Sequence, residues 1–209
     1  MNDKPLEAIP ASGPVEWAVA CQSLDEQFQS GDQYVVRLFP DRVVVAVIDG
    51  LGHGNKAAEA ALAAVQSLQT NTLPSVIPLI KRCHEDLLRT RGAVMSLASF
   101  HPAEDTLTWL GVGNVEGLLC RANGSQSRER LLLAGGVVGY RLPTLRAVVH
   151  PIAPGDTLIF VTDGIRSSFS DDLPLKQSPQ AIADHILAQH RRGTDDALVL
   201  VARYIGQPG

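Results

Sequence analysis

Short apolar segments bounded by Gly, Pro, Asn and Asp dominate the hydrophobic pattern of the chain, and such segments are typical of β-strands. Near the start, the pattern predicts strands over residues 15–22, 34–39 and 43–48, and Pro40-Asp41 joins the last two as a hairpin turn. From residue 92 onward, it predicts strands over residues 93–100, 106–111, 115–121, 130–133, 145–150, 157–162 and 197–204.

Three other segments repeat their apolar residues at helical spacing. Residues 53–70 are rich in Ala, and a second helix is expected over about residues 73–90, with a late start or a kink at Pro78. Residues 178–190 form the third, with Ser178 as its N-cap. Many strands with helices inserted at only two places, without regular strand–helix alternation, predict an antiparallel α+β layered domain.

The composition agrees with one globular domain. The 209 residues are 45% hydrophobic and 19% charged, and a chain of this length can bury a core without disulfides. Residues 1–14 contain three prolines and one glycine before any periodic pattern begins. We therefore expect a flexible arm over residues 1–14, followed by a single domain over residues 15–209.

The charge pattern argues against a nucleic-acid or membrane partner. The formal net charge is −4 and the basic residues are scattered, whereas nucleic acids and anionic membranes need a basic face. No apolar run approaches the ~18 residues of a membrane span, and the first residues lack the apolar region of a signal peptide. Cys21, Cys83 and Cys120 are isolated and form no disulfide framework. We therefore expect a cytoplasmic protein.

The strongest candidate for chemistry is Asp49, which ends an apolar strand and precedes a glycine-rich turn and a helix. A dinucleotide-binding loop has the same order of elements, but its G-x-G-x-x-G spacing would need glycine where Asn55 or Ala57 stands. A carboxylate there would also repel a pyrophosphate. A divalent cation removes that conflict, because Mg²⁺ and Mn²⁺ take oxygen ligands and the Gly50 carbonyl could share the ion.

Three further aspartates stand at predicted strand ends. Asp32 enters the strand that pairs with the Asp49 strand, Asp163 follows an apolar run and precedes a glycine, and Asp195 opens the last strand. Each of them alone is more often a turn or cap residue than a metal ligand. Their common placement at strand ends, together with Asp49, is what favours a site.

The four aspartates lie in motifs that resemble those of the PPM/PP2C-like protein phosphatases. The motifs are SGDxY at residues 30–34, DGxGHG at 49–54, TDG at 162–164 and GTDD at 193–196. Within that family the chain resembles the bacterial SpoIIE-type branch. Softer motifs resemble the RsbX-type serine phosphatases of the stressosome; these are LGVGNV at 110–115, GGVVGY at 135–140 and PGD at 154–156. The resemblance spans roughly residues 16–203.

The resemblance implies a fold and a set of ligands. The fold would be an αββα sandwich, with two antiparallel sheets between helical layers. Asp49 would bridge two Mn²⁺ or Mg²⁺ ions, the Gly50 carbonyl would bind one of them, and Asp32 would serve the same ion directly or through water. Asp163 and Asp195 would hold the other ion. Catalysis would then depend on Asp49, Asp163 and Asp195.

The implied reaction is hydrolysis of phosphoserine or phosphothreonine on a bacterial regulatory protein, either a stressosome component or a STAS-type anti-anti-sigma factor. The alternative is a pseudophosphatase that binds a phosphorylated partner without turnover. In the eukaryotic branch a histidine in DGHGG is the proposed general acid, but here Leu51 takes that place and His53 lies two residues later. The acid role is therefore not transferred to His53. No counterpart of the phosphate-binding arginine of the eukaryotic members is found near the start of the chain.

Overall fold

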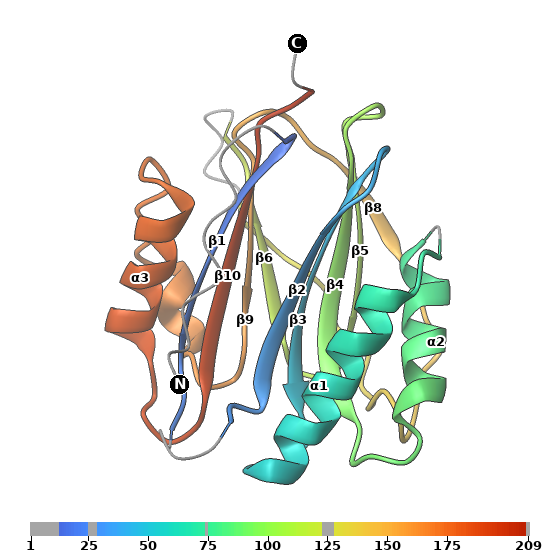
Figure 1. Cartoon of the computed structure of the whole chain (residues 1–209). Helices are drawn as coiled ribbons and strands as arrows, with labels where there is room; N and C mark the ends of the chain where they lie inside the picture. Colours follow the sequence, from blue (N-terminus) through green and yellow to red (C-terminus); the bar gives the residue numbers. More distant parts are fainter. Residues whose placement is uncertain (1–12, 25–28, 74, 123–127, 208–209) are drawn as a thin grey trace.

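Two five-stranded antiparallel sheets face each other in the computed structural model, which describes residues 13–24, 29–73, 75–122 and 128–207 (Figure 1). The first sheet has the strand order β1 (Val15–Gln22), β10 (Ala197–Tyr204), β9 (Thr157–Val161), β6 (Glu116–Cys120) and β7 (Arg128–Arg130). The second has the order β2 (Asp32–Leu38), β3 (Val43–Gly50), β4 (Ala93–His101), β5 (Thr106–Val112) and β8 (Val148–Pro151).

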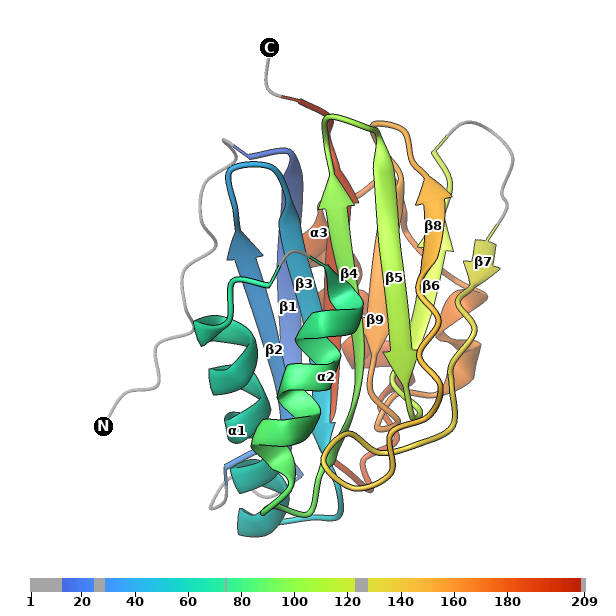
Figure 2. The same cartoon turned by 90° about the vertical axis from the view of Figure 1, so that its right-hand side faces the viewer.

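Helices cover the outer face of each sheet. The helix α3 (Pro179–His190) packs on the first sheet, and α1 (Asn55–Thr70) and α2 (Val76–Leu87) pack on the second (Figures 1 and 2). A short 3₁₀ helix, η1 (Ser167–Ser170), lies beside α3. This arrangement confirms the predicted αββα sandwich. No helix in the described part of the chain is long and apolar enough to cross a membrane.

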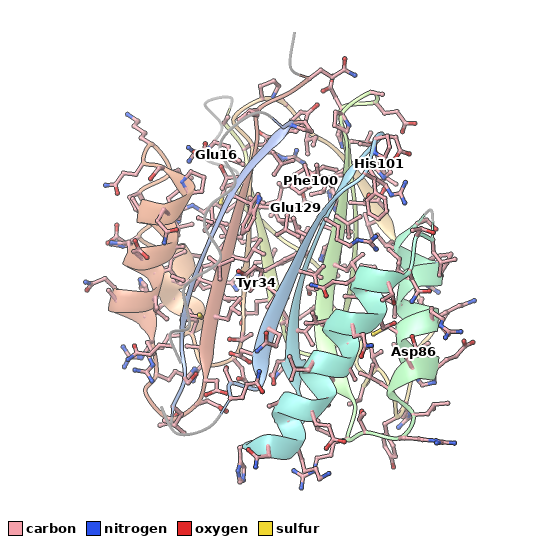
Figure 3. The ribbon with its side chains drawn as sticks, in the orientation of Figure 1. Glu16, Tyr34, Asp86, Phe100, His101 and Glu129 are labelled. Carbon is pink, nitrogen blue, oxygen red and sulfur yellow. The ribbon has the colours of Figure 1, made fainter. Side chains whose placement is uncertain are left out.

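The hydrophobic core has three layers, as the sandwich requires. The layer between the sheets contains Phe100, Trp109 and Tyr204, and the partly buried Tyr34 packs against it (Figure 3). A second layer lies between α1, α2 and their sheet, and a third lies beneath α3. Strand β3 contributes to two of these layers, which explains its unbroken run of apolar residues from Val43 onward.

The sequence predictions hold for most elements and are wrong at several ends. The hairpin at Pro40-Asp41 and the last strand are confirmed, and Ser178 caps α3 by accepting a hydrogen bond from the Ala181 amide at 3.3 Å. The second helix is shorter than predicted, and Pro78 lies in its first turn, where a missing amide hydrogen costs no helical bond. The predicted arm falls largely on residues 1–12, which lie outside the described residues.

Two strands near the edges of the sheets begin or end elsewhere than predicted. Strand β7 stops at Arg130, because Leu131 turns into the core between the sheets. Strand β8 starts at Val148, because the preceding Leu145 packs with the layer under α1 and α2.

Cys21 is exposed, whereas the other two cysteines are buried.

A glycine follows each of two strand-end aspartates because the chain is too crowded there for a side chain. A Cβ atom at Gly50 would overlap the backbone carbonyl of Ala57 in α1, and one at Gly164 would overlap the backbone of Asp196. The first contact brings the start of α1 against the end of β3. The second brings the entry to β10 against the end of β9.

We predict that Gly50→Ala lowers the free energy of unfolding by about 2–3 kcal/mol, because the added methyl must displace the start of α1. Gly135→Ala is the matched control, since a Cβ there would meet nothing within 4 Å. Urea unfolding followed by circular dichroism measures both variants. Equal stability of the two variants would contradict the crowding at Gly50.

Candidate metal centre

The four predicted aspartates come together at one end of the sandwich, the end at which β3 finishes and α1 begins (Figure 1). Asp32 and Asp49 are paired directly opposite each other on β2 and β3. Asp163 lies two residues beyond the end of β9, and Asp195 two residues before the start of β10, in the neighbouring strands of the other sheet. Each sheet therefore supplies two of the carboxylates.

Three of these carboxylates line one cavity. It has a volume of about 340 Å³, and Asp49, Asp163 and Asp195 form its wall together with Asn114 and the loop of residues 51–53. Asp49 faces the other two from across the gap between the sheets. Side chains of both sheets therefore line the cavity. Carboxylate oxygens, which can act as metal ligands, make up much of its polar lining.

Asp32 lies behind this cavity and does not line it. The side chain is only 6% exposed, and its Oδ2 accepts a hydrogen bond of 2.6 Å from the hydroxyl of Thr162. The same hydroxyl oxygen accepts a 2.9 Å hydrogen bond from the Leu198 amide. Asp32 thus links the start of β2 to the end of β9 and the start of β10, and this hydrogen-bonded contact connects the two sheets beside the cavity.

The crowding of carboxylates raises their pKa values. Burial is the main cause for Asp49, and the charges of Asp32 and Asp163 add to it, so that its pKa rises to about 8. Burial also raises the pKa of Asp32 to about 7, against the opposing effect of the Thr162 hydrogen bond. Burial and the neighbouring Asp195 raise the pKa of Asp163. Negative charge is therefore costly at this position unless a cation is bound.

Asp196 has a different role from its neighbour Asp195. Its two carboxylate oxygens accept hydrogen bonds from the backbone amides of Leu24, at 2.8 Å, and Gly31, at 2.7 Å. These bonds attach both ends of the connection between β1 and β2 to the entry of β10. Asp195 lines the cavity, and its Oδ1 accepts only the local amide of Asp196, at 2.9 Å. The structure thus separates two adjacent aspartates that the sequence motif could distinguish only by resemblance.

Asn114 is a site residue that the sequence analysis did not predict. Its amide nitrogen donates a 3.0 Å hydrogen bond to Oδ2 of Asp163. The preceding Gly113 has a φ of 101°, which turns the chain between β5 and β6 so that Asn114 reaches the cavity. An asparagine beside a glycine is so common in turns that the sequence offered no signal for this contact.

The loop after Asp49 forms the remaining wall of the cavity. The amide of Gly50 donates to the Gly31 carbonyl at 3.0 Å, and the amide of Leu51 donates to the Gly92 carbonyl at 3.0 Å. The loop is therefore attached to β2 on one side and to the start of β4 on the other. His53 lines the cavity from this loop, as does Leu51.

The donor set fits hard divalent cations. Carboxylates are ligands that Mg²⁺ and Mn²⁺ prefer, and the described residues that line the cavity include no cysteine to favour a softer metal. Gly50, the predicted carbonyl ligand, is not among the lining residues. Within residues 13–24, 29–73, 75–122 and 128–207, no three His, Cys, Asp or Glu side chains converge into a complete ligand group for one ion. The individual ligand assignments therefore stay predictions.

Comparison with known proteins identifies the family. Residues 40–205 match the family model of stage II sporulation protein E (SpoIIE), which covers most of the chain. The chain belongs to the SpoIIE family. The GTDD motif at residues 193–196 lies within the matched region, and the SGDxY motif at residues 30–34 precedes it. The resemblance to the SpoIIE-type branch is therefore confirmed.

Relatives of this SpoIIE-family chain include a curated protein and several solved structures. The phosphoserine phosphatase RsbX of Bacillus subtilis (strain 168) is 24% identical over 83% of this chain and 86% of its own length. A chain from a bacterial stressosome system adapted to control secondary messenger signalling is 26% identical, with a TM-score of 0.81 over 90% of this chain and 99% of its own.

A crystal structure of RsbX in complex with magnesium has the same TM-score of 0.81, with 20% identity over 94% of this chain and 98% of its own. At that identity the likeness establishes the fold alone. The family match and the likeness to the curated phosphoserine phosphatase confirm the predicted enzyme class, a protein serine/threonine phosphatase.

We predict that the metal-free protein loses stability as the pH rises from about 4 to about 8. The folded-state pKa of Asp49, about 8, lies above the ordinary value of 3.8, so the folded chain binds more protons than the unfolded chain in this window. Asp49→Asn should weaken that pH dependence and raise the Tm at pH 8. Thermal unfolding in EDTA at pH 5 and pH 8 measures this pH dependence for both proteins. Added Mg²⁺ should raise the Tm of the wild-type protein at pH 8. An identical pH dependence in wild type and variant would contradict the charge crowding.

Asp195 and Asp196 provide a matched pair for a second prediction. Asp196→Ala removes two hydrogen-bond acceptors for backbone amides, and we expect the free energy of unfolding to fall by about 1–2 kcal/mol. Asp195→Ala removes one acceptor, that of the neighbouring Asp196 amide, together with a negative charge from the cavity, so we expect a smaller loss of stability in the metal-free protein. Urea unfolding in EDTA distinguishes the two, and the reverse order of stability would refute these assignments.

Proposed function

We propose that this protein hydrolyses phosphoserine or phosphothreonine on a bacterial regulatory protein, using two Mn²⁺ or Mg²⁺ ions. One observation carries the proposal: Asp49 faces Asp163 and Asp195 across a single cavity between the sheets. Family membership supports it, as do the phosphoserine phosphatase activity named for a curated relative and the magnesium bound by a structural one.

The ligands divide between the two sheets. Asp49 would bridge both ions, and the Gly50 carbonyl would bind the first, while Asp163 and Asp195 would bind the second. Asp32 would serve the first ion through water, because its carboxylate lies behind the cavity and holds Thr162. The bound ions would supply an activated water for attack on phosphorus and would neutralise the phosphoryl oxygens.

The chain's own residues orient these ligands. Asn114 holds one oxygen of Asp163 and leaves the other free to bind. The backbone bonds of Gly50 and Leu51 fix the loop that forms the opposite wall. Rigid ligand positions favour catalysis, because little reorganisation is then needed in the transition state. No side chain is assigned as the general acid.

The substrate is proposed to be a component of the stressosome or a STAS-type regulator. The relatives support this class of partner, since one is a stressosome-system chain and another is RsbX. We also propose that the protein acts in the cytoplasm. The comparisons do not favour the alternative of a pseudophosphatase that only binds its partner.

We predict that Mn²⁺ supports hydrolysis of para-nitrophenyl phosphate and of a phosphoserine STAS-type protein, and that EDTA abolishes both activities. Asp49→Asn should lower kcat/KM by about a hundredfold or more, because it removes the bridging ligand. Asp171→Asn is the control, since Asp171 is exposed and lies outside the cavity. Phosphate release measures each rate.

The same samples test the number of ions. Isothermal titration calorimetry should give two Mn²⁺ per wild-type chain, with weaker binding to Asp49→Asn. Undiminished turnover in EDTA, or in the Asp49→Asn variant, would refute the two-metal mechanism. Tight binding of the phosphoprotein without any turnover would instead support the pseudophosphatase.

A further inference from the structure

Among the described residues, Arg91 is an arginine that lies against the wall of the cavity without an acidic partner. Arg91 is exposed and belongs to the turn between α2 and β4. Its Nη1 atom lies 2.9 Å from the position that a Cβ of Gly52 would occupy. Gly52 lines the cavity, so the guanidinium rests on the outer side of the cavity wall and does not enter the cavity.

The backbone around Arg91 is held firmly on both sides. The Gly92 carbonyl accepts the Leu51 amide at 3.0 Å, and the Gly92 amide donates to the Thr90 hydroxyl at 3.0 Å. Ala93 and Val138 exchange two backbone hydrogen bonds of 2.9 Å. The long side chain of Arg91 therefore starts from a fixed point next to the loop that follows Asp49.

No carboxylate in the described part of the chain forms an ion pair with Arg91. Arg82, on α2, shows the contrast, because it pairs with Asp86 of the same helix at 2.8 Å. The charge of Arg91 is thus available to a ligand, and it lies at the mouth of a cavity whose own charges are negative.

Two large exposed hydrophobic side chains belong to segments that lie against the turn of Arg91. Leu51 is 44% exposed and lines the cavity. Tyr140 is 79% exposed, and it follows Gly139, whose Cβ would lie 3.1 Å from the Cα of Gly92. Exposed apolar groups beside an unpaired arginine are a composition typical of protein-binding surfaces.

We propose that Arg91 is a specificity-determining residue that contacts acidic side chains next to the phosphorylated residue of the substrate. This inference rests on the proposed function. Once the phosphoryl group enters the cavity, the neighbouring residues of the substrate must cross the rim, since consecutive Cα atoms are only about 3.8 Å apart. The unpaired guanidinium attracts a carboxylate there and repels a lysine.

The experiment compares two phosphoserine peptides. In one peptide Glu stands directly before and directly after the phosphoserine, and in the other Lys stands at these two positions. Wild-type protein with Mn²⁺ should show a higher kcat/KM for the Glu peptide, and the preference should shrink at high salt. Arg91→Glu should lower the ratio of the two kcat/KM values about tenfold, because it replaces an attraction with a repulsion. Arg91→Lys should retain the preference for the Glu peptide.

Arg89→Glu is the matched control, because Arg89 is exposed, lies two residues away and gives the same change in net charge. It should keep the wild-type ratio. A ratio that is the same for Arg91→Glu as for Arg89→Glu would overturn the proposal. Rates are normalised to para-nitrophenyl phosphate hydrolysis by the same variant, so that a damaged metal site is recognised separately.

Failure of the proposed function is distinguishable from failure of this inference. If wild-type protein hydrolyses neither para-nitrophenyl phosphate nor a phosphoprotein, the phosphatase proposal fails. Binding of the two fluorescently labelled peptides, measured by anisotropy, still reports the effect of Arg91 on their relative affinities. Equal affinity of wild-type protein for both peptides would then refute the role of Arg91.

Discussion

The burial of neighbouring carboxylates at the gap between two sheets is the constraint on which the rest of this structure depends. Asp49 and Asp32 enter from one sheet and Asp163 and Asp195 from the other; burial is the main cause that raises the pKa of Asp32, Asp49 and Asp163, and repulsion from the neighbouring carboxylates adds to it. The two sheets must hold these groups together against that cost. The continuous apolar strands, the three core layers and the crowded glycines at the strand ends supply the rigidity that this requires.

The site divides the work among its acidic residues according to their positions. Asp49, Asp163 and Asp195 line the cavity, Asp32 lies behind them and binds Thr162, and Asp196 binds backbone amides. Similar side chains at neighbouring positions thus serve as candidate ligands, as a link between the sheets and as an anchor for a loop. Hydrogen-bond partners, and not residue type, separate these roles.

Much of the fold was predictable, because the strand and helix patterns are local properties of the sequence. The hairpin, the N-cap Ser178 and the strand–Asp–Gly arrangement were readable for that reason. The ends of β7 and β8 were not, since tertiary packing of Leu131 and Leu145 decides them. Asn114 and Arg91 were not among the predicted site residues for the same reason: Asn114 bonds Asp163 and Arg91 lies beside Gly52, and both neighbours are distant in sequence.

The order of the strands in the first sheet has a consequence for synthesis of the protein. Strand β10 is the last of the described strands, yet it lies between β1 and β9, inside its sheet, and Asp195 stands just before it. A nascent chain that has not yet released this segment from the ribosome lacks both the strand that joins β1 to β9 and the Asp195 side of the cavity. With the proposed ligands, cations would therefore stabilise only a chain in which β10 has joined the sheet, and phosphate removal would begin only after that step.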